Sequence, residues 1–181
     1  MTLLAVDPGI SNGLAVINDA RELLLATEIP VIGEGAHRRL NLTSFADIIT
    51  QFHVMRAVIE DVAARPGQGV SSMFRFGRAT GALEGALAAL KIPTTFVSPA
   101  RWKKDLGAKA KQDEDIRALA IQTWPTMAHR FARKADHNRA EAALIGLWAL
   151  QHSGIRVAEQ NIKPIPSGSR VFVGGEGWRT L

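Results

Sequence analysis

Three acidic residues lie at the end of an apolar run or inside one, where a carboxylate is more useful for catalysis or metal binding than for solubility. Asp7 ends the apolar run TLLAVD and precedes a Pro-Gly pair, and Glu60 ends a second apolar run, VMRAVIE. Glu141 lies inside an alanine-rich apolar segment, where a charge needs a partner, a metal ion or water. Carboxylates that meet at one point bind hard divalent cations, and two such ions about 4 Å apart can hydrolyse a phosphodiester bond.

Further candidate ligands come just before Glu141, in the segment DHNRAE. Asp136 is a suitable N-cap for the helix that follows. Asn138 shares a helix face with Glu141 at a spacing of three, and His137 does so at a spacing of four. The predicted catalytic and metal-binding residues are Asp7, Glu60, Asp136 and Glu141, with Asn138 or His137 as an alternative ligand.

Three of the four acids also have a structural explanation. Asp7 before Pro-Gly suits a turn, Glu60 could be a solvated strand end, and Asp136 could be only a helix cap. The occurrence of all three in this order favours the catalytic interpretation.

Positive charge is concentrated in one part of the chain, which carries a net charge of +5 overall. Residues 100–139 hold ten Lys and Arg against five Asp and Glu, a surplus equal to that of the whole chain. This concentration favours a polyphosphate partner, and the alternative is a solvated face that aids solubility. Lys111 opens a predicted helix, an unfavourable place for a cation, so we predict a catalytic role for it. The predicted DNA-binding residues are Arg65, Arg75, Arg78, Arg101, Lys103, Lys104, Lys109, Arg133 and Lys134.

The elements that must position these residues alternate along the chain. The predicted strands cover residues 2–7, 13–17, 22–29, 54–60 and 94–98. The predicted helices cover residues 39–52, 70–91, 111–123 and 138–151, and residues 33–38 are predicted as a loop. Short turns make the first three strands an antiparallel meander, and the later strands add to it in parallel, which predicts an α/β fold with helices on both faces of a mixed five-stranded sheet. Ligands collect at strand ends in such sheets, so Asp7 and Glu60 converge if their strands are neighbours.

Gly77, Gly81 and Gly85 recur every four residues in the long predicted helix. Glycine is costly within a helix, so a close backbone approach is the expected compensation. Packing on the sheet is favoured over a dimer seam. Phe74 is expected in the core.

Composition excludes several protein classes. There is no cysteine, so disulfides and thiolate metal sites are excluded, and no run of eighteen apolar residues predicts a membrane span. The acid at position 7 favours a strand over a signal peptide. Residues 1–152 are predicted to form the catalytic domain and residues 153–181 a Gly- and Pro-rich basic extension, with a strand at 170–173. We expect a cytoplasmic protein of a bacterial cell.

The ordered motifs resemble the RuvC family of Holliday junction resolvases, particularly its phage-encoded branch. The resemblance covers residues 4–150 and is carried by LAVDPG (4–9), GLAVI (13–17), VIEDV (58–62), VSPARWKK (97–104), KQDE (111–114), WP (124–125) and ADHNRAEA (135–142). It also implies an alternative to the core position of Phe74, in which Phe74 or Phe76 is a wedge between DNA bases.

This resemblance implies an RNase H-like homodimer that resolves four-way DNA junctions by paired symmetric nicks. It implies two Mg²⁺ or Mn²⁺ ions per site, no nucleotide cofactor and no membrane, with the catalytic acids at Asp7, Glu60 and the Asp136/Glu141 pair. Many members of the family end in two ligands three residues apart. Here that spacing pairs Asn138 with Glu141, and a neutral amide is a weaker ligand than a carboxylate.

Two other functions remain open from the sequence. One is another RNase H-like nuclease that acts on branched or flapped DNA or on RNA–DNA hybrids. The other is a junction-binding protein whose catalysis is weakened at Asn138. A phosphotransferase that also begins with an acid after a strand would need a second, repeated domain, which 181 residues hardly hold.

Overall fold

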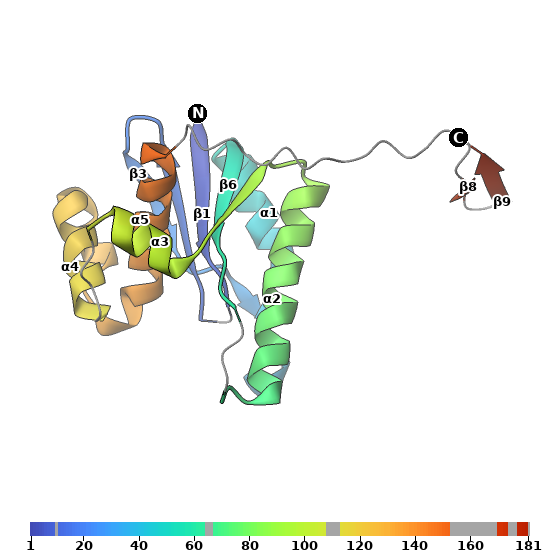
Figure 1. Cartoon of the computed structure of the whole chain (residues 1–181), viewed down its shortest axis with the longest axis horizontal. Coiled ribbons are helices and arrows are strands. Elements are labelled where there is room, and N and C mark those ends of the chain that lie inside the picture. Colours follow the sequence, from blue (N-terminus) through green and yellow to red (C-terminus); the bar gives the residue numbers. More distant parts are fainter. Residues whose placement is uncertain (10, 64–66, 108–112, 153–169, 174–176, 181) are drawn as a thin grey trace.

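The computed structural model describes residues 1–9, 11–63, 67–107, 113–152, 170–173 and 177–180. Its centre is a five-stranded mixed sheet in the order β3-β2-β1-β6-β7 (Figure 1). The strands are β1 (Thr2–Asp7), β2 (Gly13–Asn18), β3 (Leu23–Thr27), β6 (Val54–Glu60) and β7 (Thr94–Val97). The first three form the predicted antiparallel meander, and β6 and β7 run parallel to β1. The predicted sheet is confirmed.

Helices cover both faces of this sheet. They are α1 (Leu42–Gln51), α2 (Val70–Ala89), α3 (Pro99–Asp105), α4 (Asp113–Thr123) and α5 (His137–Gln151), with the 3-10 turns η1 (Gly35–His37), η2 (Pro125–Arg130) and η3 (Lys134–Asp136). Figure 1 shows α1 and α2 on one side of the sheet and α3, α4 and α5 on the other. No helix in these described ranges is both long and apolar enough to cross a membrane.

Two apolar cores follow from the alternation of side chains along β1. Leu3 and Ala5 belong to the core beneath α5, and Leu4 and Val6 to the core beneath α1 and α2. By the same alternation Asp7 points to the α5 side. This assignment places the first acid of the predicted site on the α5 face of the sheet.

Two segments differ from the prediction. Helix α3 was missed: it begins with Pro99 at its first position, where the missing amide hydrogen costs nothing. The predicted loop at residues 33–38 is partly ordered as η1, which joins the two short strands β4 (Val31–Ile32) and β5 (Arg39–Leu40). Helix α1 therefore starts later than predicted, after Asn41, whose side chain accepts a hydrogen bond from the amide of Ser44.

The predictions for the long helix α2 were wrong on two points. A methyl group added at Gly77, Gly81 or Gly85 would meet no atom within 4 Å, so these glycines do not pack on the sheet. Phe74 is 69% exposed and is not in the core. The face of α2 that carries these residues is turned outward, away from the sheet.

Near the C-terminus, the predicted strand at residues 170–173 is confirmed as β8 (Arg170–Val173). It pairs with a strand that was not predicted, β9 (Gly177–Thr180), in an antiparallel ladder.

Candidate active site

The first two acids come from neighbouring parallel strands. Val6 of β1 pairs with Ile59 of β6, so the next residues along, Asp7 and Glu60, end the two strands side by side. Glu60 follows the alternation of Val58, which lies in the core beneath α5. Both carboxylates therefore point to the same face, and both side chains are buried.

The third acid reaches this face because α5 lies unusually close to the sheet. A Cβ atom on Gly13 of β2 would overlap the carbonyl of Asn138 and lie 2.9 Å from the amide nitrogen of Arg139. Further along, a Cβ on Gly146 would lie 2.6 Å from Cδ1 of Ile17. The two glycines let α5 pack directly on β1 and β2, and Glu141 is one turn into this helix and buried.

The electrostatics of Asp7 link the three acids. Burial raises the pKa of the Asp7 carboxyl well above its ordinary value, and the charges of Glu141 and Glu60 raise it further. Lys103 acts in the opposite direction. The surroundings of Asp7 therefore disfavour its charged form, and a cation bound beside the three acids would favour it.

Helix α3 supplies two partners of the other acids. Trp102 is fully buried, and its Nε1 donates a hydrogen bond of 2.7 Å to Oε1 of Glu60. Nζ of Lys103 lies 2.6 Å from Oε1 of Glu141 and 5.0 Å from the centre of the Trp102 ring. Sequence reasoning placed Lys103 among the DNA-binding residues, whereas the structure brings it into the group of acids. Trp102 was missed; the signal was an aromatic residue inside an otherwise charged stretch.

His137 joins the same group from the first turn of α5. Its Nε2 lies 3.3 Å from Oε2 of Glu141. Burial opposes ionisation of Glu141, but the hydrogen bonds from His137 and Lys103 outweigh it and lower the pKa of this carboxyl. Glu141 is therefore held as a carboxylate between two donors.

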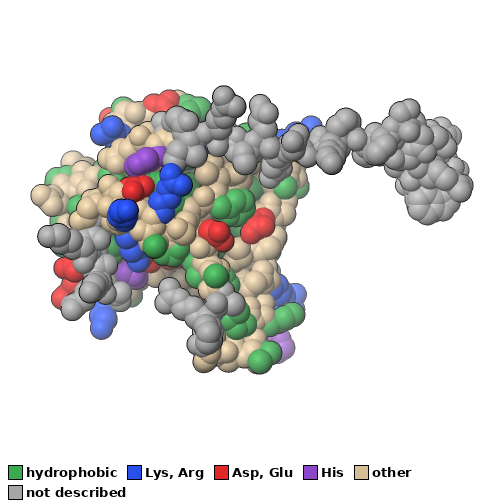
Figure 2. Space-filling model, viewed as in Figure 1, with side chains coloured by type: hydrophobic (Ala, Val, Ile, Leu, Met, Phe, Trp, Pro, Cys, Tyr) green, Lys and Arg blue, Asp and Glu red, His purple; other side chains and the backbone are tan. Residues whose placement is uncertain are grey.

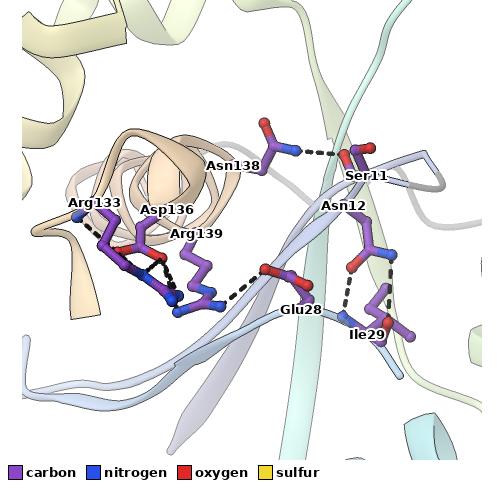
Figure 3. Close-up of polar contacts among 8 residues, drawn as sticks. All are labelled: Ser11, Asn12, Glu28, Ile29, Arg133, Asp136, Asn138 and Arg139. Carbon is purple, nitrogen blue, oxygen red and sulfur yellow. Dashed lines mark hydrogen bonds and ion pairs between the residues drawn. The ribbon is translucent and has the colours of Figure 1, made fainter. Parts of the chain in front are cut away.

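Asp136 contacts two arginines and not the other three acids (Figure 3). Its buried carboxylate accepts a hydrogen bond of 2.9 Å from the backbone amide of Arg133 and pairs at 2.9 Å with the Arg133 guanidinium. Arg139 completes the cluster, lying 3.1 Å from Asp136 and 2.9 Å from Glu28. The structure thus places Asp136 in an ionic cluster that fixes the entry to α5 and does not bring it to the other three acids. Its side chain makes no cap hydrogen bond to α5 either.

We expect Asp136→Asn to lower the free energy of unfolding by about 1.5 kcal/mol at neutral pH. The substitution removes the charge-assisted hydrogen bonds of the carboxylate. The loss is moderate because water already screens the exposed side chain of Arg133. Burial disfavours the charged form of Asp136, but hydrogen bonds from Arg133 and the charge of Arg139 prevail and lower its pKa from 3.8. The carboxylate therefore stabilises the fold fully above about pH 4, and this contribution is lost as the pH falls through the lower folded pKa.

Urea unfolding of the wild type and of Asp136→Asn at several pH values measures this difference. The difference in unfolding free energy between the two proteins should be largest at pH 7 and should decrease as the pH is lowered. An Asp136→Asn protein of unchanged stability that has lost affinity for Mn²⁺ would instead make Asp136 a metal ligand.

Asn138 also has a structural partner. Its Nδ2 donates to the backbone oxygen of Ser11 in the β1–β2 turn (Figure 3). In the same turn, Asn12 accepts a hydrogen bond from the amide of Ile29. The Asn138 amide therefore ties α5 to this turn, beside the end of β1 that carries Asp7.

The remaining basic residues lie outside this buried group. Figure 2 shows Lys and Arg side chains gathered around α3 on one face of the molecule. Arg101 lies 5.7 Å from the centre of the Trp148 ring, and Lys104 and Lys134 are exposed. Arg75 and Arg78 are exposed on α2. The predicted residues Arg65, Lys109 and Lys111 fall outside the described residues.

The carboxylate oxygens of Asp7, Glu60 and Glu141 suit a hard divalent cation, although they are not arranged as a complete coordination shell. In the described ranges, no three acidic or histidine side chains already surround one point closely enough to enclose a metal ion. Lys103 and His137 hold Glu141, and Trp102 holds Glu60. The buried carboxylate of Asp7, whose neighbours include two further acids, is nevertheless the chemistry that Mg²⁺ or Mn²⁺ prefers.

Known proteins share similarity with this chain both in sequence and in structure. No protein-family model matches the chain. It is 33% identical over 86 residues to the chloroplastic Holliday junction resolvase MOC1 of Chlamydomonas reinhardtii, a match that covers 47% of this chain. The chain spans only about 10% of the length of this curated relative.

Two solved structures share the fold. RuvC of Thermus thermophilus in complex with a Holliday junction substrate superposes with a TM-score of 0.67 at 17% identity, covering 87% of this chain and 97% of the other. A second Thermus thermophilus RuvC structure gives a TM-score of 0.54 at 18% identity, covering 84% and 97%. The fold is that of RuvC, and the predicted RNase H-like architecture is confirmed.

Proposed function

We propose that this chain is a RuvC-type Holliday junction resolvase, an endonuclease that cuts four-way DNA junctions by paired symmetric nicks. The observation that carries the proposal is the position of Asp7, Glu60 and Glu141, from β1, β6 and α5, on one face of the sheet, where the charges of the other two acids raise the pKa of Asp7. The RuvC fold and the sequence similarity to a junction resolvase support it.

In this proposal Asp7, Glu60 and Glu141 hold two Mg²⁺ or Mn²⁺ ions. Such ions, when bound, lower the pKa of water for attack on phosphorus and stabilise the leaving oxygen. The residues of the chain orient these ligands. Trp102 orients the Glu60 carboxylate through a hydrogen bond from its indole N–H. The ammonium group of Lys103 forms an ion pair with the Glu141 carboxylate and balances its charge. If a divalent cation balanced the charge of Glu141, the Lys103 ammonium could pair with a DNA phosphate instead.

The second component of the proposal is a homodimer, because a four-way junction presents two symmetry-related phosphates. The outward face of α2 suits a second copy of the chain. A hollow of about 330 Å³ between α2 and β7 is lined by Gly81, Gly85 and Phe96, and Phe96 is 46% exposed. An apolar side chain beside open glycines allows two helices to approach closely.

The experiment that tests the proposal uses strand-labelled four-way junctions, flaps, linear duplex and RNA–DNA hybrid, each with and without Mg²⁺ or Mn²⁺. We expect metal-dependent nicks at symmetric positions in opposite strands of the junction. Linearisation of a plasmid that extrudes a cruciform reports both nicks within one binding event. Preference for flaps or hybrids would support another RNase H-like nuclease instead.

Binding without cutting would support the weakened junction-binding protein. The ion pair of Asp136 with Arg133 favours that alternative, because it leaves three acids at the site and not four. The contact of Asn138 with Ser11 favours it as well, because it occupies a possible neutral ligand. Cutting of the junction at a rate well above that of linear duplex would contradict it.

We further propose a bacterial cytoplasmic location, membership of the phage-encoded branch, and a separate extension at residues 153–181. The relative from Chlamydomonas reinhardtii is a chloroplast protein.

A further inference from the structure

Four arginines line a second hollow, on the α2 side of the sheet. It measures about 240 Å³, and its apolar floor includes buried Leu40 and Ala79. We call it the arginine groove and define it by Arg38, Arg39, Arg75 and Arg78. Only Arg75 and Arg78 were predicted to bind DNA; the other two come from a segment that was predicted as a loop and the first residues of a helix.

The fold builds this groove from two distant segments. Arg38 and Arg39 follow η1, and the pairing of Ile32 with Arg39 in the β4–β5 ladder fixes their backbone. The turn between these strands needs Gly33, whose φ is +76° and where a Cβ would lie 2.7 Å from the carbonyl oxygen of His37. The arginines are therefore set by a tight turn and a strand ladder.

The other wall is the first half of α2. Arg75 and Arg78 are three residues apart, so they lie on one helix face. Nε of Arg75 donates to the backbone oxygen of Ser71, which orients the side chain and leaves its terminal NH groups for another partner.

The charge of the groove is not balanced within the described part of the chain. All four arginines are exposed, and none of them forms an ion pair with an acid there, although Glu34 precedes η1 in the same turn. Four like charges on one hollow repel each other unless an anion joins them. A planar guanidinium binds a phosphate through two parallel hydrogen bonds, so a phosphate backbone fits this cluster well.

The groove shares Arg75 with another hollow, near the ends of β1 and β6. This hollow is larger, about 380 Å³, and its other walls include Pro8 and Gly9, just after Asp7, and Val62 and Ala63, just after Glu60. Arg75 therefore links the arginine groove to the strand ends that carry Asp7 and Glu60, and a DNA strand that follows both hollows would meet Arg75 between them.

We propose that the arginine groove binds the DNA backbone of a junction arm beyond the cleavage point. This inference rests on the proposed function, and it adds a phosphate-binding surface in which Arg38 and Arg39 take part. The groove acts on binding and leaves the chemical step at the acids unchanged.

The test compares Arg38→Ala/Arg39→Ala with the wild type in binding a four-way junction without metal, at several salt concentrations. Each lost phosphate contact should reduce the slope of log K against log salt by about one, so the double variant should lose about two. Junction affinity should fall about tenfold or more near physiological salt. Single-turnover cleavage at saturating protein should keep the wild-type rate.

A matched control distinguishes an effect of the groove from the effect of removing any exposed positive charge. Lys91 is also exposed but lies just beyond the C-terminal end of α2, at the opposite end of that helix from Arg75 and Arg78. Arg39→Ala should reduce the salt slope by about one and Lys91→Ala should leave it unchanged. Equal losses for the two single variants would overturn the inference.

The outcomes distinguish this inference from the proposed function. If the wild type cuts junctions and the double variant keeps the wild-type salt slope, the groove inference fails and the resolvase proposal stands. If the double variant loses binding to a polyglutamate probe while it keeps the wild-type slope for DNA, the groove serves an acidic protein segment, which also overturns it. A loss of slope in a protein that binds junctions but cuts none would support the groove and contradict the proposed function.

Discussion

Asp7→Asn should reduce metal-dependent cleavage of a four-way junction about a thousandfold and leave junction binding intact. The amide keeps the shape of the side chain but removes the charge that the divalent cations would balance. Metal-assisted stabilisation of the transition state amounts to several kcal/mol, and about 4 kcal/mol corresponds to a thousandfold in rate. Single-turnover rates at saturating protein measure the first effect, and gel-shift affinity without metal measures the second.

Asp61→Asn is the matched control. Asp61 follows Glu60 directly, but its side chain is exposed, while its backbone amide bonds to Val97. It should retain cleavage within about threefold of the wild type, because an exposed charge is well screened. Undiminished cleavage by Asp7→Asn would contradict the assignment of the site.

Gly13→Ala should lower the free energy of unfolding by about 3 kcal/mol and abolish cleavage in the fraction that still folds. The new methyl group would overlap the Asn138 carbonyl, which is backbone and cannot move without shifting the first turn of α5. Overpacking of this kind costs about 1–3 kcal/mol and sometimes more. Because Glu141 lies one turn further along α5, the same shift would also move it relative to Asp7.

Gly69→Ala provides the comparison for this substitution. Gly69 has a φ of −64°, which any residue adopts, and no atom lies within 4 Å of an added Cβ. Its stability should stay within about 1 kcal/mol of the wild type. Urea unfolding with an unchanged m-value measures both variants, and a Gly13→Ala protein as stable as Gly69→Ala would show that α5 does not pack as described.

The sheet was predictable from the sequence because its strands are short apolar runs that end at turn residues. The runs before Asp7 and Glu60 fixed where those acids emerge, and alternation put them on one face. The surroundings of the α2 glycines were harder to predict. Their spacing shows that they share a helix face, but it does not show whether that face packs on the sheet or is turned outward. Only the position of the neighbouring elements decides that.

The parts of the site that were not predicted depend on tertiary contacts. Helix α3 is seven residues long, too short for a clear periodic pattern, and so the roles of Trp102 and Lys103 could not be seen. Asp136 illustrates the converse. An acid at the start of an apolar helix suits a metal ligand and a structural ion pair equally well, and the contacts of Arg133 and Arg139 favour the second. Sequence spacing cannot place those two guanidinium groups around one carboxylate.

The most direct measurement of the central claim is Mn²⁺ binding, followed by electron paramagnetic resonance without DNA. Asp7→Asn, Glu60→Gln and Glu141→Gln should each weaken Mn²⁺ binding at least about tenfold, because each removes a carboxylate ligand from the same ions. Asp61→Asn should bind as the wild type does. If any one of the three variants binds Mn²⁺ as tightly as the wild type, the acids do not form one metal site and the account is contradicted.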